Sequence, residues 1–230
     1  MGGGSLDGLA RAMASLGASV ALLTDSPERN DHAASHVLQW DKSSLSTTRE
    51  SVDAALAVVG EPAVVVVRTL PDEALRGCEA IEHNSLHWNE ACGRTMLQTI
   101  HLLQCLAPAL KRQQASVIFV GPSLSLVGAA GLAALVTLLE SQRGLMKSIA
   151  RQWGKHGVTC NWVALEAREL LSEFSRFNIP ARMEAVPVAL GRRPNASGDL
   201  SGVVEFLGSA AGRTLTGTTL CLDGGEWMVP

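Results

Sequence analysis

The segment Leu215-Thr216-Gly217-Thr218-Thr219-Leu220-Cys221-Leu222-Asp223-Gly224-Gly225 joins a short run of apolar and β-branched residues to an Asp-Gly-Gly turn. Such a run, bounded by glycines, is typical of a buried strand. Similar runs recur upstream, at residues 20–23, 36–38, 64–67, 117–120 and 158–163, and helical patterns separate them. Strands that alternate with helices predict an α/β fold, here a doubly wound parallel sheet with helices on both faces.

Composition limits the class of protein. With 230 residues, a net charge of −3 and 47% hydrophobic residues, the chain is predicted to form one domain over residues 1–230 with a sizeable core. No basic stripe indicates a nucleic-acid partner, and no apolar run is long enough to cross a membrane. The five cysteines are odd in number and lack the usual spacings of metal sites, so we expect reduced core thiols, a cytoplasmic location and no bound metal.

Several short motifs occur in a fixed order along the chain. Residues 4–10 have the spacing of a glycine turn, with Ala10 in the third glycine position. Trp88, Gln104 and Pro108 follow on a predicted helix, and residues 116–120 and 156–161 precede the closing Asp-Gly-Gly segment. The ordered set resembles the short-chain dehydrogenase/reductase family over almost the whole chain. The resemblance implies a Rossmann-like sheet and NAD-dependent redox chemistry.

The resemblance leaves one strand unaccounted for. In the family a strand precedes the glycine turn and lies in the middle of the sheet, but only Met1-Gly2-Gly3 precede the turn here. We therefore expect a Rossmann-like sheet without its first strand, unless the sequence begins downstream of its natural start. Residues 20–23 and 64–67 then either pair directly or leave unpaired backbone between them.

The positions that carry the family's chemistry have changed in this chain, which contains no tyrosine. The family's tyrosine aligns with Leu135 and its lysine with Leu139, one helical turn apart. Neither leucine can titrate or donate a hydrogen bond. The serine position is Pro122, with Ser123 and Ser125 close by, and the asparagine of the fourth helix aligns with Thr95. The resemblance thus implies a chain without catalytic residues of the family type.

The cofactor-binding positions are degenerate in the same way. Gly4, Gly8 and Ala10 keep the glycine-turn spacing but can equally serve helix packing, and Asp25 stands one place after the expected ribose-binding acid. Asp41 aligns with a residue that touches adenine in the family, or it caps the following helix. The family's Asn-Asn-Ala-Gly turn reads Val67-Arg68-Thr69-Leu70, whose bulk would obstruct a nucleotide. We expect no cofactor bound by this chain.

Relocated chemistry remains an alternative. His101, Asp41, Glu166 and Cys92 are candidates for a general acid or nucleophile, although His101 lies among apolar helix neighbours and Cys92 has no base beside it in the sequence. The predicted substrate loop, residues 170–193, has cations in or beside it that suit a carboxylate or a CoA phosphate, or simple solvation. These cations are Arg168, Arg176, Arg182 and Arg192.

The helix predicted at residues 132–153 is more apolar than one core face requires, and residues 203–207 and 227–229 add a second apolar stretch. The family assembles tetramers through these regions. We therefore expect a heterotetramer in which a catalytic paralogue holds NAD and this chain does not catalyse. The alternatives are a regulatory protein that binds a nucleotide or acyl-CoA, and an oxidoreductase with relocated catalytic residues.

Overall fold

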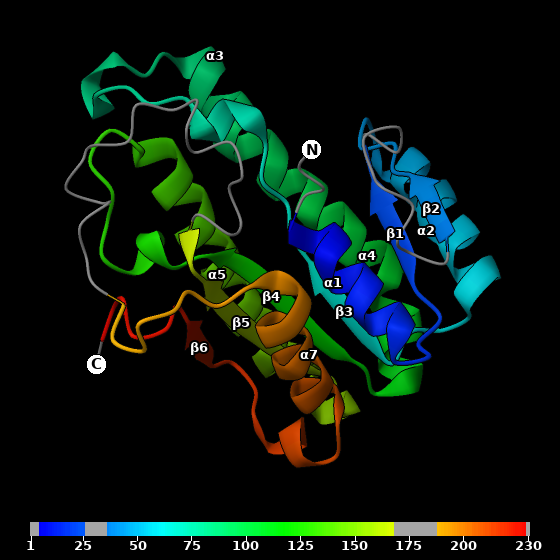
Figure 1. Cartoon of the computed structure of the whole chain (residues 1–230). Helices are drawn as coiled ribbons and strands as arrows, with labels where there is room; N and C mark the ends of the chain where they lie inside the picture. The colour runs from blue at the N-terminus through cyan, green and yellow to red at the C-terminus, as the bar shows by residue number, and fades with distance from the viewer. Residues whose placement is uncertain (1–4, 26–35, 168–187, 229–230) are drawn as a thin grey trace.

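The computed structural model describes residues 5–25, 36–167 and 188–228 (Figure 1). Within these ranges the longer helices are α1 (Ser5–Ser15), α2 (Leu45–Val59), α4 (Thr95–Gln113), α5 (Ala133–Trp153) and α7 (Ser201–Gly208). The strands are β1 (Ala21–Thr24), β2 (His36–Gln39), β3 (Val64–Val67), β4 (Ser116–Pro122), β5 (Thr159–Leu165) and β6 (Thr219–Leu222). The apolar runs of the sequence therefore predict these strands within two residues at each end.

All the described strand pairs are parallel, but the strands form two separate sheets. β1 pairs with β2, and β3, β4, β5 and β6 pair in that order. The register places Pro122 beside Leu165 and Leu165 beside Leu222, so three strands of the larger sheet end level with one another. This alignment confirms the Rossmann-like class and gathers the residues that follow these strands at one edge.

The division between the two sheets falls where the family's first strand would lie. Among the described residues β1 and β3 do not pair with each other, so the direct pairing of residues 20–23 with residues 64–67 does not occur. β4 and β5 are buried along their whole length, whereas β1 is only partly buried and β3 is fully buried only at Val67. The two strands next to the break are thus less buried than β4 and β5.

The helices form two layers around the strands (Figure 1). α1 and α7 lie together on one side, where Gly208 of α7 packs against Val64 of β3. α2, α4 and α5 lie on the other side and contact one another in sequence order. α2 begins with a capping box in which Ser44 and Thr47 each bond the other's backbone N–H, which satisfies donors that a helix start leaves open.

The centre of the core lies between β4, β5 and α5. Phe119 and Trp162 are neighbours across these strands, and their rings stack with centroids 6.2 Å apart. Gly121 shares the face of Phe119 because it is two residues further along β4. A methyl group at Gly121 would overlap the Trp162 indole, at 2.8 Å from Cη2, and would lie 3.1 Å from Leu139 Cδ2. The glycine therefore makes room for the indole beneath α5.

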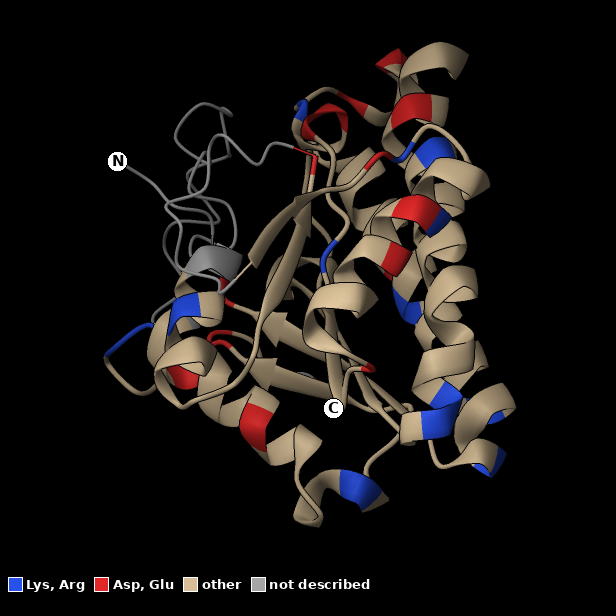
Figure 2. Cartoon of the chain, turned by 90° about the vertical axis from the view of Figure 1, so that its right-hand side faces the viewer, with Lys and Arg blue, Asp and Glu red and all other residues tan. Residues whose placement is uncertain are grey.

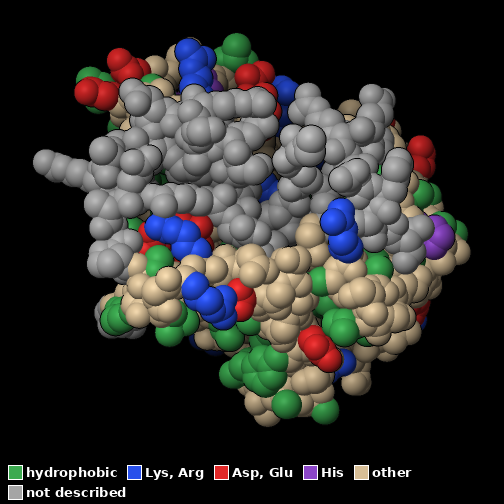
Figure 3. Space-filling model, in the orientation of Figure 1, with side chains coloured by type: hydrophobic (Ala, Val, Ile, Leu, Met, Phe, Trp, Pro, Cys, Tyr) green, Lys and Arg blue, Asp and Glu red, His purple; other side chains and the backbone are tan. Residues whose placement is uncertain are grey.

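The sequence-based argument for an interface on residues 132–153 is wrong in most of its residues. Five of its seven apolar side chains are at most 5% exposed and belong to the subunit's own core: Leu135, Leu138, Leu139, Met146 and Ile149. Elsewhere Leu97 of α4 is 52% exposed and Phe206 of α7 is 42% exposed. Figure 3 shows hydrophobic side chains gathered on the lower part of one face, over α7 and the segment that follows it.

Charged residues are distributed along the helices and loops in both signs, while the strands carry almost none (Figure 2). None of the described helices combines the length and the apolar character that a membrane span needs.

Candidate functional site

The carboxyl edge of the larger sheet is the place where open α/β sheets bind ligands. β4 is followed there by the short helix η5 (Ser123–Leu126), and β5 is followed by Glu166. β6 is followed by Asp223, whose carboxylate accepts hydrogen bonds from the backbone N–H groups of Gly225 (3.0 Å) and Trp227 (3.1 Å). The Asp-Gly-Gly sequence thus forms a turn that its own carboxylate holds closed, with φ of 68° at Gly224 and 80° at Gly225.

Leu135 and Leu139 lie beneath this edge on α5, and their side chains are 0% and 2% exposed. The Trp162 indole and the Leu139 side chain both lie against Gly121, so apolar groups surround the Leu139 position. A leucine side chain neither titrates nor donates a hydrogen bond. This part of the site therefore has no group that passes a proton to a carbonyl.

Two hydroxyl groups remain at the edge after Pro122. Ser123 and Ser125 are 0% and 5% exposed, and neither Oγ has a hydrogen-bond partner among the residues that the structure describes. A buried hydroxyl without a partner costs about 1–3 kcal/mol. Such groups in a native protein are typical of a place where a water or a ligand completes the bonding.

A chain of hydrogen bonds links Thr69, in the turn after β3, to α4 and α5. Gln142 Nε2 donates to the carbonyl oxygen of Thr69 (2.8 Å) and to Thr69 Oγ1 (2.7 Å), and Thr69 Oγ1 lies 2.7 Å from Thr99 Oγ1. Thr99 in turn donates to the carbonyl oxygen of Thr95 (2.9 Å). All four side chains are buried. These hydrogen bonds therefore hold the turn after β3 against α4 and α5, and Thr95 takes part through its backbone carbonyl.

The candidates for relocated chemistry do not meet at one point. Cys92 is buried and donates from Sγ to the carbonyl oxygen of Ala134 (3.4 Å), and burial raises its pKa, so it stays a thiol. His101 is partly buried and its Nδ1 has no hydrogen-bond partner in the structure. It shares a helical face with Gln98 and Cys105, whose side chains contact the backbone of Lys42 and Leu45 at the start of α2. His101 thus lies toward α2.

Glu166 lies at the carboxyl edge but is part of an ion-pair cluster. Arg193 Nη1 pairs with Glu166 Oε1 and lies 3.9 Å from Glu226 Oε1, and the two carboxyl side chains are 3% and 5% exposed. The Arg193 guanidinium therefore lies between two buried carboxylates. The sequence motifs gave no indication of Arg193, because the cluster joins residues from three separate segments.

The positions expected to hold a nucleotide have other contacts. Asp25 forms an ion pair with Lys42 (2.5 Å), and Asp41 Oδ1 accepts a hydrogen bond from the backbone N–H of Ser43 (2.9 Å). Hydrogen bonds from Ser43 lower the pKa of Asp41. Gly8 lies within α1, where an added Cβ would be 3.6 Å from that of Ser197, and Ala10 is buried. Gly4 lies outside the described residues.

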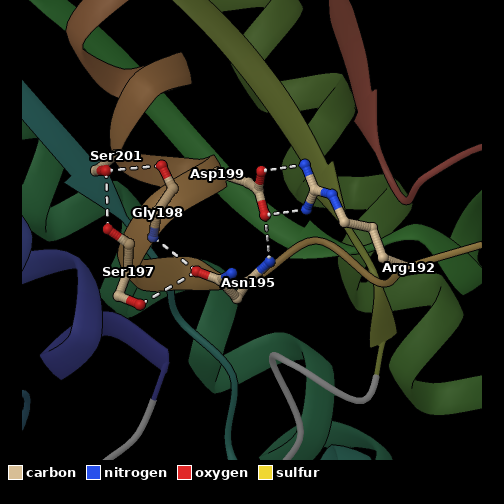
Figure 4. A network of polar contacts seen from close by, with 6 residues as sticks. All are labelled: Arg192, Asn195, Ser197, Gly198, Asp199 and Ser201. Carbon is tan, nitrogen blue, oxygen red and sulfur yellow. Dashed lines mark hydrogen bonds and ion pairs between the residues drawn. The ribbon is translucent and has the colours of Figure 1, made fainter. Parts of the chain in front are cut away.

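Arg192 is the described member of the four cations proposed for the substrate loop (Figure 4). Its guanidinium makes two bonds to Asp199, at 2.8 and 2.9 Å, and Asp199 Oδ2 also accepts from the backbone N–H of Asn195 (3.0 Å). Asn195 Oδ1 accepts from Gly198 N (2.7 Å) and caps the helical turn before α7. Arg192 therefore stabilises this turn, while Arg168, Arg176 and Arg182 lie outside the described residues.

We expect Asp199→Asn to lower the free energy of unfolding by about 1 kcal/mol at pH 7, because it removes the ion pair with Arg192. Hydrogen bonds from Arg192 and then from Asn195 lower the pKa of Asp199 from 3.8. A carboxyl group that is more acidic in the folded state stabilises fully above its unfolded pKa, and the effect disappears as the pH falls through the folded pKa. Urea unfolding at a series of pH values should show that the difference in free energy of unfolding between Asp199→Asn and wild type narrows below pH 3.8.

The matched control for this prediction is Glu205→Gln, on the exposed surface of α7. We expect it to leave the free energy of unfolding within about 0.5 kcal/mol of wild type at every pH. If the free energy of unfolding of Asp199→Asn differs from wild type by a constant or increasing amount at acid pH, the ion pair between Asp199 and Arg192 is not what stabilises this turn.

Comparisons with known proteins agree with this geometry. The model of a family described as enoyl-(acyl carrier protein) reductase matches residues 7–226. The chain is 28% identical over 148 residues to the 3-oxoacyl-[acyl-carrier-protein] reductase FabG of Salmonella typhimurium, covering 62% of this chain and 58% of that relative's length. It is 26% identical over 209 residues to the human (3R)-3-hydroxyacyl-CoA dehydrogenase, covering 89% of this chain and 77% of the relative.

Among solved structures, the fold matches the 3-ketoacyl-(acyl-carrier-protein) reductase of Brucella melitensis, crystallised with NADH. The TM-score is 0.81 at 20% identity, over 98% of this chain and 94% of the other. That likeness concerns the fold, and the family model adds a sequence match over most of the chain. The chain belongs to the short-chain dehydrogenase/reductase family.

Proposed function

We propose that this chain is a non-catalytic subunit of a heteromeric NAD-dependent short-chain alcohol dehydrogenase. In this proposal it stabilises a catalytic paralogue that oxidises a hydroxyacyl-CoA-type substrate. The observation that carries the proposal is the pair of buried leucines on α5, Leu135 and Leu139, the second of which lies with the Trp162 indole against Gly121. A proton donor and the cation that would lower its pKa are replaced by side chains that do neither.

The residues present do not fit a nicotinamide dinucleotide. Asp25 forms an ion pair with Lys42, and the Thr69 hydroxyl is hydrogen-bonded to Gln142 and Thr99. Leu139 offers no hydrogen-bond donor to a ribose hydroxyl. We therefore derive no catalytic step through NAD in this chain and assign the cofactor to the partner. No residue of this chain has a catalytic role in the proposal.

The exposed apolar side chains support an assembled state. Phe206 of α7 and Met228 near the end of the chain are 42% and 80% exposed, and Leu97 of α4 is 52% exposed. Burial of such residues against a partner stabilises both chains by mass action. In this proposal the chain has the same kind of role as the inactive subunit of the hydroxybenzylsuccinyl-CoA dehydrogenase of anaerobic toluene degradation. The similarity to a hydroxyacyl-CoA dehydrogenase supports the proposed substrate class.

The test begins with the tagged chain purified from its native host. We expect it to carry a stoichiometric, tyrosine-containing paralogue, and we expect the complex to oxidise NADH with acetoacetyl-CoA as the probe substrate. Replacing the paralogue's tyrosine should abolish this activity, whereas Ser123→Ala in this chain should leave it unchanged. A chain that assembles only with itself and turns over NADH would overturn the proposal.

Ser123 and Ser125 favour a second candidate, a regulatory module that binds acyl-CoA or a nucleotide without turnover. Their buried hydroxyls have no hydrogen-bond partner in the structure, as expected where a ligand completes the bonding. Acetyl-CoA at 100 times its dissociation constant should then stabilise the isolated chain by about 2.7 kcal/mol. The double variant Ser123→Ala/Ser125→Ala should lose this effect. Melting curves unchanged by acetyl-CoA and by NADH would exclude this candidate.

A further inference from the structure

The segment between β3 and α4 brings together three side chains that carry the donor atoms of a metal site. It folds as a series of short turns: η2 (Asp72–Leu75), η3 (Ala80–Glu82), α3 (Ser85–Trp88) and η4 (Asn89–Arg94). Cys78, His83 and His87 come from successive turns, and one ligand atom from each lies within 4.8 Å of the other two. All three are partly buried, and none belongs to the site at the carboxyl edge.

The separations between the donor atoms suit a tetrahedral ion. His83 Nδ1 lies 3.1 Å from His87 Nδ1, and Cys78 Sγ lies 3.6 Å from His83 Nδ1 and 3.3 Å from His83 Nε2. Zinc binds imidazole nitrogen at about 2.0–2.1 Å and thiolate sulfur at about 2.3 Å, so two ligand atoms of a tetrahedral site are about 3.3–3.6 Å apart. The His83–His87 and Cys78–His83 separations are close to these values, and the Cys78 and His87 donors lie within 4.8 Å of each other, so the three donors can converge on one ion.

The backbone around these residues holds them in place. The backbone N–H of Cys78 donates to the carbonyl oxygen of Gly131 (3.0 Å), and Cys78 forms a parallel β-bridge with Leu132 just before α5. Asn84 caps α3 by accepting from the backbone N–H of His87 (2.8 Å). His83 and His87 are four residues apart, and their rings stack with centroids 4.8 Å apart. The positions of the three donors are therefore set by secondary structure.

A second hydrogen bond fixes which nitrogen of His87 is available. His87 Nε2 lies 2.9 Å from the carbonyl oxygen of Glu73. A carbonyl oxygen only accepts, so Nε2 carries a proton, and in the neutral ring the lone pair on Nδ1 is available to a ligand. A ligating histidine whose other nitrogen donates to a backbone carbonyl is the usual arrangement around protein-bound metals.

The local charge also favours a cation. Residues 72–87 contain four exposed carboxylates and one basic side chain: Asp72, Glu73, Glu79 and Glu82 against Arg76. Figure 2 shows several acidic positions in the upper part of the molecule, where this segment lies. A negative field raises the local concentration of divalent ions.

We propose that Cys78, His83 and His87 bind one divalent ion of the zinc class, with water as the fourth ligand. On binding, the Cys78 thiol loses its proton to solvent and forms the metal–thiolate bond, while each imidazole supplies a nitrogen lone pair. One proton is released for each ion bound. The ion closes the loop from Cys78 to His87 and stabilises this segment beside the start of α5. The site is independent of whether the chain catalyses.

The test uses the full chain without a polyhistidine tag, stripped with a chelator, and Co²⁺ as the probe. We expect one equivalent of Co²⁺ to produce thiolate-to-metal charge-transfer absorption and the intense visible bands of four-coordinate cobalt. Zn²⁺ should displace these bands and raise the melting temperature. Cys78→Ser should remove the charge-transfer band, and His83→Ala or His87→Ala should weaken binding on the order of 100-fold.

The matched controls are Cys221→Ser, which changes an exposed thiol on β6, and His156→Ala, an exposed histidine after α5. Both should keep the stoichiometry and the spectrum. Circular dichroism of the stripped variants separates loss of a ligand from loss of the fold. The proposed site is wrong if one equivalent of Co²⁺ produces no charge-transfer or visible cobalt bands. It is also wrong if these bands survive Cys78→Ser and disappear in Cys221→Ser.

Discussion

The double substitution Leu135→Tyr/Leu139→Lys, which supplies the family's tyrosine and lysine, is expected to unfold the chain at low urea concentrations and to create no dehydrogenase. Leu135 and Leu139 are 0% and 2% exposed. A tyrosine ring overpacks such a site by about 1–3 kcal/mol, and a buried ammonium group costs several kcal/mol more. The sum, about 5 kcal/mol, is comparable to the whole stability of a small domain.

The control places the same two residues at the same spacing on the other side of α5. Thr137 and Ser141 are exposed, so Thr137→Tyr/Ser141→Lys should change the free energy of unfolding by less than about 1 kcal/mol. Urea unfolding followed by circular dichroism compares the two double variants. If Leu135→Tyr/Leu139→Lys keeps the wild-type midpoint and reduces acetoacetyl-CoA with NADH, the site is accessible, and both the packing described here and the statement that this chain does not fit a nicotinamide dinucleotide are wrong.

The second large effect is expected for Gly121→Ala, which should lower the free energy of unfolding by about 3 kcal/mol. The new methyl group would overlap the Trp162 indole and press on Leu139. The indole has little room to move, because its ring stacks on Phe119 and its residue is fully buried. Trp162→Phe in the same chain should recover part of the loss, because the smaller ring leaves space for the methyl group.

Gly144→Ala on α5 is the control for the same chemical change. No atom lies within 4 Å of the added methyl group, and alanine favours the helix. We expect this variant to gain about 0.5–1 kcal/mol. If Gly121→Ala and Gly144→Ala both change the free energy of unfolding by the same small amount, the packing described for Trp162 is wrong.

The strands could be predicted from the sequence because each is a short apolar run between glycines and polar turns. Val64–Val67 and Thr219–Leu222 match in full, because each is a short apolar or β-branched run that ends at a change to polar or glycine residues. The family could be predicted for the same reason, because its ordered motifs are mainly packing and turn residues. Asp223 is one example, with a carboxylate that closes its own turn.

Long-range contacts could not be predicted. Gln142 bonds to Thr69 across 73 residues, and no local pattern predicts that pair. The sequence predicts an interface on α5 from its excess of apolar residues, and that prediction fails for most of them. One sequence does not show how much of a helix is covered by the sheet and turns of its own chain. Here β5, η4 and η5 all pack against α5, whose Leu135 and Leu139 side chains are buried.

The group of Cys78, His83 and His87 was missed for a related reason. Its spacing of five and then four residues is not one of the usual metal-site patterns, and it depends on the short turn at Ala80–Glu82. In that turn the Glu82 side chain accepts a hydrogen bond from the backbone N–H of Glu79 (2.9 Å), which orients the chain between the cysteine and the first histidine.

The division of the strands into two sheets has a consequence for how the native state opens. No described backbone ladder joins β1 and β2 to β3, so α2 joins them to the rest by packing on α4. The unit formed by β1, β2 and α2 therefore opens at a lower free energy than global unfolding. Amide protons of β1 and β2 should exchange with solvent deuterium earlier than those of β4 and β5, whose ladders lie inside the larger sheet.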